Sequence, residues 1–243
     1  MKICLIGYGK MGKAIEQQAN NRGHIISSII TRSTTESITK LLHNSDVVIE
    51  FTQPESALQN IRLCMEHNIP IISGTTGWTH EWEKMLEFQK NKNGKMVWAS
   101  NFSVGVNILF QINQKLAQIM NSQEQYSVAV EEIHHTQKKD APSGTALTLT
   151  EQILNKIKRY TNWHLTENKS NSNSIPIHAI RKDSVIGFHE IKYSSEIDEI
   201  KISHNAFTRE GFALGAVLAA EWIINSKCGV YNMGDVLGLN SKL

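Results

Sequence analysis

The sequence predicts an α/β protein in two parts, a parallel sheet covered by helices and, after it, an antiparallel or mixed sheet. Short apolar runs alternate with helical segments up to residue 99, a pattern typical of parallel strands with helices on both faces. Beyond residue 174 three strand-like runs follow one another without helices between them, which favours antiparallel or mixed pairing. A glycine-rich turn directly after the first apolar run indicates a ligand at the first strand–helix junction.

The first part is predicted to hold five strands with helices between them. The apolar runs that predict strands are residues 3–6, 24–30, 47–51, 70–73 and 96–99. The segments with helical periodicity are residues 11–21, 56–68 and 79–92.

The second part begins with a helix, a strand and another helix, predicted at residues 106–120, 127–135 and 142–158. The first of these helices carries an apolar stripe formed by Ile108, Ile112, Leu116 and Ile119. The three later strands are predicted at residues 175–182, 187–194 and 199–203, after a polar loop at 166–174. A last apolar helix at 212–225 could pack back on the first part. We therefore expect one domain over residues 1–105 plus 207–243 and another over 106–206.

Composition excludes several classes of partner. Of 243 residues, 40% are hydrophobic and 20% charged, with a net charge of +2, which is ordinary for a soluble globular protein. The basic residues are scattered, so we expect neither a nucleic-acid nor a membrane surface. Cys4, Cys64 and Cys228 lack metal-ligand spacing and predict reduced thiols, no metal site and a cytoplasmic protein. The N-terminal apolar run is too short for a signal peptide.

The glycine-rich turn has the form of a dinucleotide-binding loop. Its G-x-G-x-x-G spacing provides a tight turn, a close backbone approach to a pyrophosphate and close packing of helix on strand. A plain glycine turn would look similar, but the position within an alternating strand–helix unit favours a Rossmann-type domain. The candidate cofactor residues of this loop are Gly7, Tyr8, Gly9, Lys10, Met11 and Gly12.

The second predicted strand ends in Thr31-Arg32-Ser33, where an NAD site usually has an acidic residue on the ribose. Arg32 would instead meet a 2′-phosphate, so the sequence favours NADPH over NADH; a solvent-exposed loop arginine is the alternative. Loops at the carboxyl ends of two further strands could hold the nicotinamide. Their candidate cofactor residues are Gly74, Thr75, Thr76, Ala99, Ser100, Asn101 and Phe102.

Residues 131–146 read EEIHHTQKKDAPSGTA and predict a site that binds an acid and handles protons. Successive strand residues point to opposite faces, so one of His134 and His135 would act on the reacting atoms and the other would anchor substrate or structure. Lys138 could reach back from the following loop, whereas its neighbour Lys139 fits a solvated surface residue. The helix start could hold a carboxylate, although simple N-capping uses the same groups. Its candidate residues are Ser143, Gly144 and Thr145.

On these residues the chain resembles the dihydrodipicolinate reductase family of the diaminopimelate and lysine pathway. The resemblance rests on E-x-H-H-x-x-K-x-D-A-P-S-G-T-A, which runs without a break from Glu132 to Ala146. The glycine loop supports it. Shorter matches extend it over nearly the whole chain, at residues 51–54, 74–77, 99–107, 202–204 and 212–216.

The resemblance implies a Rossmann-type domain completed by the C-terminal helix, and an inserted α+β substrate domain with an open mixed sheet through which subunits form a homotetramer. It implies NAD(P)H-dependent reduction of 4-hydroxy-tetrahydrodipicolinate, a cyclic dicarboxylate, to tetrahydrodipicolinate. His134 matches the family's proton donor, Lys138 its second catalytic residue, and His135 with residues 143–145 its substrate-binding positions. Two departures concern the cofactor. Thr31 replaces a common acidic residue, and the short stretch 32–46 implies a reduced sheet beside the adenosine.

Two other interpretations fit parts of the sequence. Another NADP-dependent oxidoreductase, of the inositol dehydrogenase-like group, would share the glycine loop, but a Ser-Gly-Thr helix start beside two histidines favours a dicarboxylate over a sugar alcohol. A non-enzymatic dinucleotide sensor would also keep the loop. The pairing of His134 with Lys138 argues against a sensor, which needs no proton donor.

Overall fold

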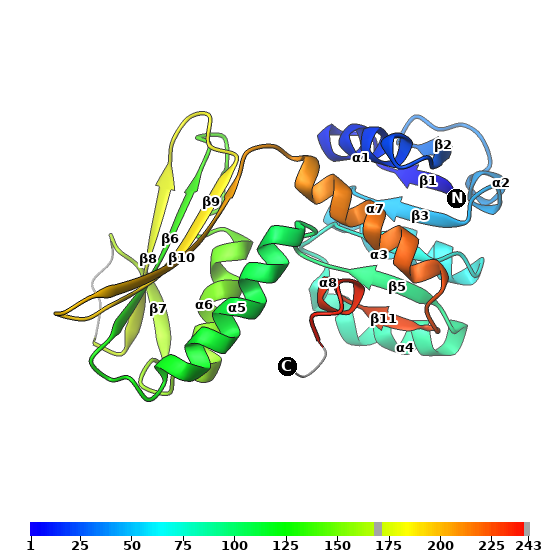
Figure 1. Cartoon of the computed structure of the whole chain (residues 1–243). Coiled ribbons are helices and arrows are strands. Elements are labelled where there is room, and N and C mark those ends of the chain that lie inside the picture. The colour runs from blue at the N-terminus through cyan, green and yellow to red at the C-terminus, as the bar shows by residue number, and fades with distance from the viewer. Residues whose placement is uncertain (168–171, 241–243) are drawn as a thin grey trace. The chain divides into compact units, whose positions relative to one another are not determined.

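The computed structural model describes residues 1–167 and 172–240. The chain divides into two compact units, coloured along the sequence in Figure 1. Unit 1 comprises Met1–Val104 and Arg209–Leu243, and unit 2 comprises Gly105–Thr208.

Unit 1 contains a six-stranded parallel sheet, which confirms the predicted Rossmann-type architecture. Its strands are β1 (Lys2–Ile6), β2 (Ile25–Ile30), β3 (Val47–Glu50), β4 (Ile71–Ser73), β5 (Lys95–Trp98) and β11 (Gly229–Tyr231), in the order β11-β5-β4-β3-β1-β2. The strand order reverses at β1, because β2 lies on one side of it and β3 on the other. Open α/β sheets bind ligands outside the carboxyl ends of the strands at such a switch point.

Helices cover both faces of this sheet (Figure 1). They are α1 (Lys10–Asn21), α2 (Ile38–His43), α3 (Pro54–Glu66), the 3₁₀ turn η1 (Thr79–Glu81), α4 (Trp82–Lys92), α7 (Glu210–Ile224) and α8 (Met233–Val236). On one face, Ile15 of α1 and Val217 of α7 are buried in one cluster with Ile49. On the other face, Ile61 of α3 and Met85 of α4 form a second cluster. The predicted C-terminal helix therefore does pack back on the first part of the chain.

The chain leaves unit 1 beside the helix by which it returns. A Cβ atom on Gly215 of α7 would lie 1.7 Å from the carbonyl oxygen of Phe102, so only glycine permits this approach. One turn earlier, a Cβ on Gly211 would lie 3.8 Å from Oγ of Ser103, an ordinary contact distance. Helix α7 is thus seated on the segment that follows β5.

Unit 2 contains a five-stranded mixed sheet in the order β10-β9-β6-β8-β7. Its strands are β6 (Ser127–His134), β7 (Asn162–Leu165), β8 (Ser174–Arg181), β9 (Gly187–Ser194) and β10 (Glu199–Ala206). Strand β6 runs parallel to β8 and antiparallel to β9. Helices α5 (Val104–Met120) and α6 (Gly144–Lys156) lie on the same face of this sheet (Figure 1). Alternate residues of β6 are buried beneath them. No helix in the described part of unit 2 covers the other face of this sheet.

Three of the four residues of the apolar stripe predicted on α5 are exposed, whereas Leu116 is half-buried and packs against the core. Ile108, Ile112 and Ile119 are 42%, 48% and 55% exposed. The helix instead buries Leu109 and Ala117 against the sheet. Of the helices in the described part of the chain, none is long and apolar enough to cross a membrane.

The sequence does not predict the short strands and helices that lack an apolar run. Strand β7 reads NWHL and is mostly exposed, and β11 has three half-buried residues at the edge of the first sheet. Between β2 and β3 the chain forms only the six-residue α2, so β2 is an edge strand. The polar loop predicted at 166–174 falls partly outside the described residues, and β8 begins at Ser174.

Candidate active site

The glycine loop joins β1 to α1 at the switch point of the first sheet. Gly7 has φ of +92°, in the left-handed region that favours glycine. A Cβ there would lie 2.1 Å from the carbonyl oxygen of Phe51. At Gly9, the residue that caps α1, no described atom lies within 4 Å of the Cβ position. The backbone at the positive end of α1 is therefore open to an anionic ligand.

A cavity of about 750 Å³ lies beside this loop. Among its lining residues are Gly7, Tyr8, Gly9, Thr31, Arg32, Ser33, Phe51, Thr52 and Gln53. The amide of Thr31 donates to Oγ1 of Thr34 at 2.8 Å, and the hydroxyls of Thr31 and Ser33 are 2.9 Å apart. This turn presents an exposed guanidinium, that of Arg32, beside hydroxyl groups. Such groups suit an anion, and the cavity beside the glycine loop fits a dinucleotide.

A buried carboxylate joins the loops after β3 and β4. Glu50 is fully buried and accepts hydrogen bonds from the hydroxyls of Ser73 and Thr75, both at 2.7 Å. The hydroxyl of Thr52 donates to it as well. The amide of Thr52 in turn donates to Oγ1 of Thr75 at 2.8 Å. Thr75, a predicted cofactor residue, is therefore fixed against a lining residue of the cavity.

The other candidate cofactor residues lie around the same edge of the sheet but do not line this cavity. In α1 or at the carboxyl ends of β4 and β5 are Lys10, Met11, Gly12, Gly74, Thr75, Thr76, Ala99, Ser100, Asn101 and Phe102. Phe102 is buried, with its ring centroid 5.7 Å from that of Phe51. It therefore contributes to the packing of the loop.

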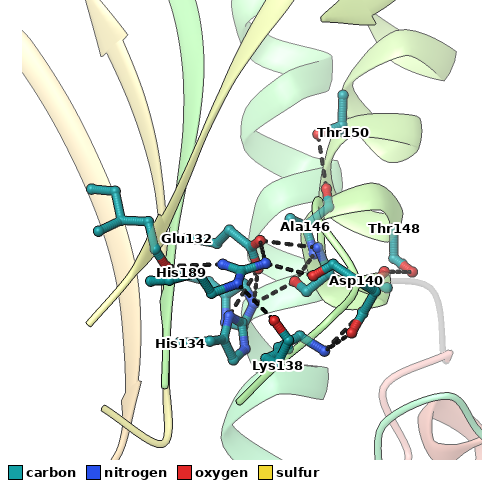
Figure 2. A network of polar contacts seen from close by, with 12 residues as sticks. Glu132, His134, Lys138, Asp140, Ala146, Thr148, Thr150 and His189 are labelled. Atoms are coloured by element: carbon teal, nitrogen blue, oxygen red, sulfur yellow. Dashed lines mark hydrogen bonds and ion pairs between the residues drawn. The ribbon is translucent and has the colours of Figure 1, made fainter. Parts of the chain in front are cut away.

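In unit 2, strand register brings ionisable groups together at the end of β6 (Figure 2). Nδ1 of His134 lies 2.9 Å from Oε2 of Glu132, and both residues are buried. His189 of β9 is directly opposite Glu132, with its ring centroid 5.0 Å from that of His134. Arg181 of β8 is opposite His134, and its Nη2 donates to Oε1 of Glu132 at 3.0 Å. Three strands thus contribute to one polar cluster.

Burial and neighbouring charges shift the pKa values of Glu132 and His189. Burial raises the pKa of Glu132, but hydrogen bonds from His134, Ser143 and Arg181 outweigh it and hold the pKa at about 2. Burial, assisted by the charge of His134, lowers the pKa of His189 to about 3. At neutral pH Glu132 is therefore an anion and His189 is neutral.

Lys138 lies on the turn after β6, as Figure 2 shows. Its amide donates to the carbonyl of His135, a half-buried residue, at 3.1 Å. Its Nζ is 2.8 Å from both carboxylate oxygens of Asp140. Partial burial raises the pKa of Asp140, but the hydrogen bond and charge of Lys138 lower it below its usual value. The ammonium group of Lys138 is thus held close to the strand end that carries His134.

The predicted helix start is the beginning of α6. Ser143 is its N-cap, and its hydroxyl accepts a hydrogen bond from the amide three residues on, as in simple capping. Its own amide donates to Glu132 at 3.0 Å, and its Oγ lies 3.2 Å from Nε2 of His189. Ser143 is buried, whereas Gly144 is exposed and Thr145 half-buried. Gly144 and Thr145 form the first turn of α6, and backbone amides at a helix N-terminus favour an anion such as a carboxylate.

A metal is a weaker explanation of the cluster. Glu132, His134 and His189 offer ligand atoms within 4.8 Å of one another. The contacts at 3.0 Å from Arg181 and at 2.9 Å from His134 already compensate the carboxylate. We therefore interpret the cluster as a network of polar contacts.

A single sequence does not identify Arg181 or His189 as site residues. Both depend on the register of β8 and β9 against β6, and register arises from contacts between segments distant in sequence. Alternation along β9 does carry one signal, because it places His189 on the face shared by buried Ile191 and Tyr193.

Both parts of the chain match models of one protein family. The model described as "Dihydrodipicolinate reductase, N-terminus" matches residues 1–102, and that described as "Dihydrodipicolinate reductase, C-terminus" matches residues 105–237. The 4-hydroxy-tetrahydrodipicolinate reductase of Christiangramia forsetii is 46% identical over 239 residues, 98% of each chain. That of Lawsonia intracellularis is 35% identical and matches 98% of this chain and 99% of its own length.

Solved structures show the same fold. A dipicolinate-bound dihydrodipicolinate reductase from Paenisporosarcina sp. TG-14 superposes with a TM-score of 0.75 at 21% identity, over 96% of this chain and 97% of that one. A scyllo-inositol dehydrogenase from Lactobacillus casei reaches 0.58 at 10% identity, over 98% and 92%. The family models and full-length relatives do not favour the inositol dehydrogenase-like alternative. By the match of both its parts and of its whole length, this chain belongs to the dihydrodipicolinate reductase family.

Proposed function

We propose that this chain catalyses the NAD(P)H-dependent reduction of 4-hydroxy-tetrahydrodipicolinate to tetrahydrodipicolinate in diaminopimelate and lysine biosynthesis. One observation carries the proposal: the His134–Glu132 contact, Lys138 and the start of α6 meet at the end of β6. The family membership of the chain names the reaction, and this cluster contains the chemical groups that the reaction requires.

The residues have distinct parts in the mechanism. When bound, the reduced nicotinamide supplies a hydride to an unsaturated carbon of the substrate ring. Protonated His134 gives a proton to the neighbouring carbon; its N–H bond breaks, a C–H bond forms, and the N–H electron pair stays on the imidazole. Lys138 stabilises the negative charge that develops before this transfer. His135 and residues 143–145 hold the substrate, with the amides of α6 facing a carboxylate. Before hydride transfer the ring loses its hydroxyl together with a hydrogen of the adjacent carbon as water, which creates the unsaturated carbon that accepts the hydride. One hydride and one proton are then added.

The cofactor is a nicotinamide dinucleotide, and we propose that NADPH is preferred. The support is the exposed Arg32 in a hydroxyl-rich turn that lines the same cavity as Gly7 and Gly9. A guanidinium favours a ribose phosphate, whereas an unmodified ribose is usually bound by a carboxylate.

We further propose a cytoplasmic homotetramer assembled through the uncovered face of the second sheet. That face includes Ile180 of β8, which is 40% exposed, and the half-buried Ile133 and Phe188 of β6 and β9. Light scattering coupled to gel filtration should give four times the chain mass of 27.4 kDa. The free thiols of the chain, including the exposed Cys228, fit a reducing compartment.

The test is oxidation of NADPH, followed by absorbance, in the presence of the product of dihydrodipicolinate synthase. We expect turnover by the native chain, and a fall in kcat of about 100-fold or more in His134→Gln and Lys138→Ala with cofactor affinity retained. Lys139→Ala, at the exposed neighbouring lysine, is the matched control and should keep its kcat. Cofactor binding without turnover by the native chain would instead support the sensor.

A further inference from the structure

The carboxylate of Glu132 is held so that each oxygen has a different task. Oε1 accepts hydrogen bonds from the amide of Ser143 and from Nη2 of Arg181, both at 3.0 Å. Oε2 lies 2.9 Å from Nδ1 of His134. Because two donors from other elements fix Oε1, the carboxylate cannot rotate freely, and Oε2 stays beside the imidazole.

The other ring nitrogen of His134 faces a position without a side chain. A Cβ atom on Gly187, the first residue of β9, would lie 3.3 Å from Nε2 of His134 and 3.5 Å from its Cδ2. Glycine therefore keeps space beside Nε2, while Nδ1 lies 2.9 Å from an oxygen of a buried carboxylate. The two nitrogens of one ring are in distinct surroundings.

Arg181 connects this arrangement to the loop that carries Lys138. Besides Glu132, its guanidinium donates to the carbonyl of Lys138 at 3.3 Å and to that of Asp140 at 2.5 Å. His189 does not compete for the carboxylate as a cation, because burial lowers its pKa to about 3. The negative charge of Glu132 therefore acts on His134 and Arg181.

We propose that Glu132 is a positioning residue that keeps a proton on Nδ1 of His134 and leaves Nε2 as the atom that gives its proton to the substrate. In that step the Nε2–H bond breaks, a C–H bond forms on the substrate, and the ring becomes neutral with Nδ1 still protonated. Solvent then restores the proton on Nε2. The role in catalysis rests on the proposed function, but the state of the ring does not.

Several charged or titratable groups surround His134 and bear on any pH-dependent readout. By element they are Glu132 of β6, Lys138 and Asp140 of the following turn, Arg181 of β8, His189 of β9 and, opposite His189, His204 of β10. Substitution of Glu132 alone isolates its contribution, because the other groups are present in both proteins compared.

The experiment combines ¹⁵N NMR of the histidine rings with steady-state kinetics of Glu132→Gln. In the native chain the neutral ring of His134 should carry its proton on Nδ1; in the variant this preference should be lost. The variant should lose about 100-fold in kcat, with KM for the substrate within about threefold and NADPH affinity unchanged. Glu132→Asp keeps the charge and should recover part of the kcat. Glu151→Gln, the same change at an exposed position of α6, is the control.

Other outcomes would overturn the proposal. A native His134 protonated on Nε2 in its neutral form would overturn it, and so would a folded Glu132→Gln with normal kcat. If Glu132→Gln does not fold, Gly187→Ala tests whether Nε2 of His134 gives the proton, because the added methyl group would crowd Nε2. It should lower kcat while the proton on Nδ1 is retained, and unchanged turnover would refute the assignment of Nε2. Failure of the native chain to turn over substrate would refute the proposed function, yet the NMR result would still decide the protonation of His134.

Discussion

Replacing His189 with glutamine should make the protein less sensitive to acid. His189 is 4% exposed, and burial is the main cause that lowers its pKa from 6.5 to about 3. In the unfolded chain this imidazole regains its ordinary pKa, so between those two values the unfolded state binds more protons than the folded state. The contribution is fully present above pH 6.5 and is lost progressively as the pH falls toward 3. Glutamine preserves a polar group near Ser143 and has no such titration.

The magnitude follows from the size of the shift. One pKa unit corresponds to about 1.4 kcal/mol, so acidification from about pH 7.5 to about pH 5 should cost the native chain about 2 kcal/mol through His189 alone. Glu132 shifts in the same sense, from 4.5 to about 2, and its contribution is lost mainly below 4.5. Burial also lowers the pKa of His204, but that residue is present in both proteins. The difference between the two proteins therefore isolates His189.

The assay is urea unfolding by circular dichroism at several pH values, with hydrogen exchange of peptides from β9 to assign the transition to unit 2. The free energy of unfolding of His189→Gln should fall by about 2 kcal/mol less than that of the native chain over this range. His178→Gln, at an exposed position of β8 in the same sheet, should retain the native pH dependence. Equal pH dependence in the native chain and His189→Gln would refute the reasoning.

Three further substitutions test other parts of the structure. Gly215→Ala should destabilise the protein by about 1–3 kcal/mol in thermal unfolding, because its methyl group would overlap a carbonyl oxygen. Gly211→Ala in the same helix should be neutral or stabilising by up to about 1 kcal/mol, and equal losses would contradict this explanation. Arg32→Gln should raise KM for NADPH by about tenfold and leave that for NADH nearly unchanged; equal effects on both would make Arg32 an ordinary surface residue. Glu50→Gln should cost about 1–3 kcal/mol in urea unfolding, since an amide cannot accept from all the surrounding hydroxyls; a stability equal to the native value would contradict the role given to that network.

Local patterns predicted five of the six strands of unit 1, because its buried strands are continuous apolar runs such as β3. The glycine loop was predictable for a related reason, since its spacing has a local steric basis. Strand β7 lacks both signals: it is short, its first two residues are exposed and the other two half-buried, and among the described strands its partner is β8. The sequence therefore gives little indication of its existence.

Helix α5 shows where apolar spacing fails. A sequence cannot distinguish a stripe buried in its own unit from one that stays exposed, and in α5 Ile108 and Ile112 are exposed while Asn113 is fully buried. Asn113 is tolerated because its amide donates to the carbonyl of Leu149 and to the side chain of Gln152. Those partners belong to α6, which is more than thirty residues away in the chain. The Glu132 cluster escaped prediction in the same way, because its partners Arg181 and His189 arrive on other strands.

The packing of α7 on the segment after β5 bears on how unit 2 could be inserted into or exchanged from unit 1. The chain departs from unit 1 just after Phe102 and returns at Arg209, at the start of α7. Gly215 and Gly211 of α7 lie against Phe102 and Ser103, so the departing and returning segments are side by side. Two chain ends that lie close together on a surface tolerate the insertion or exchange of a domain. An ancestral nucleotide-binding unit could thus acquire or replace its substrate half at a single junction, without rearrangement of its own strand order.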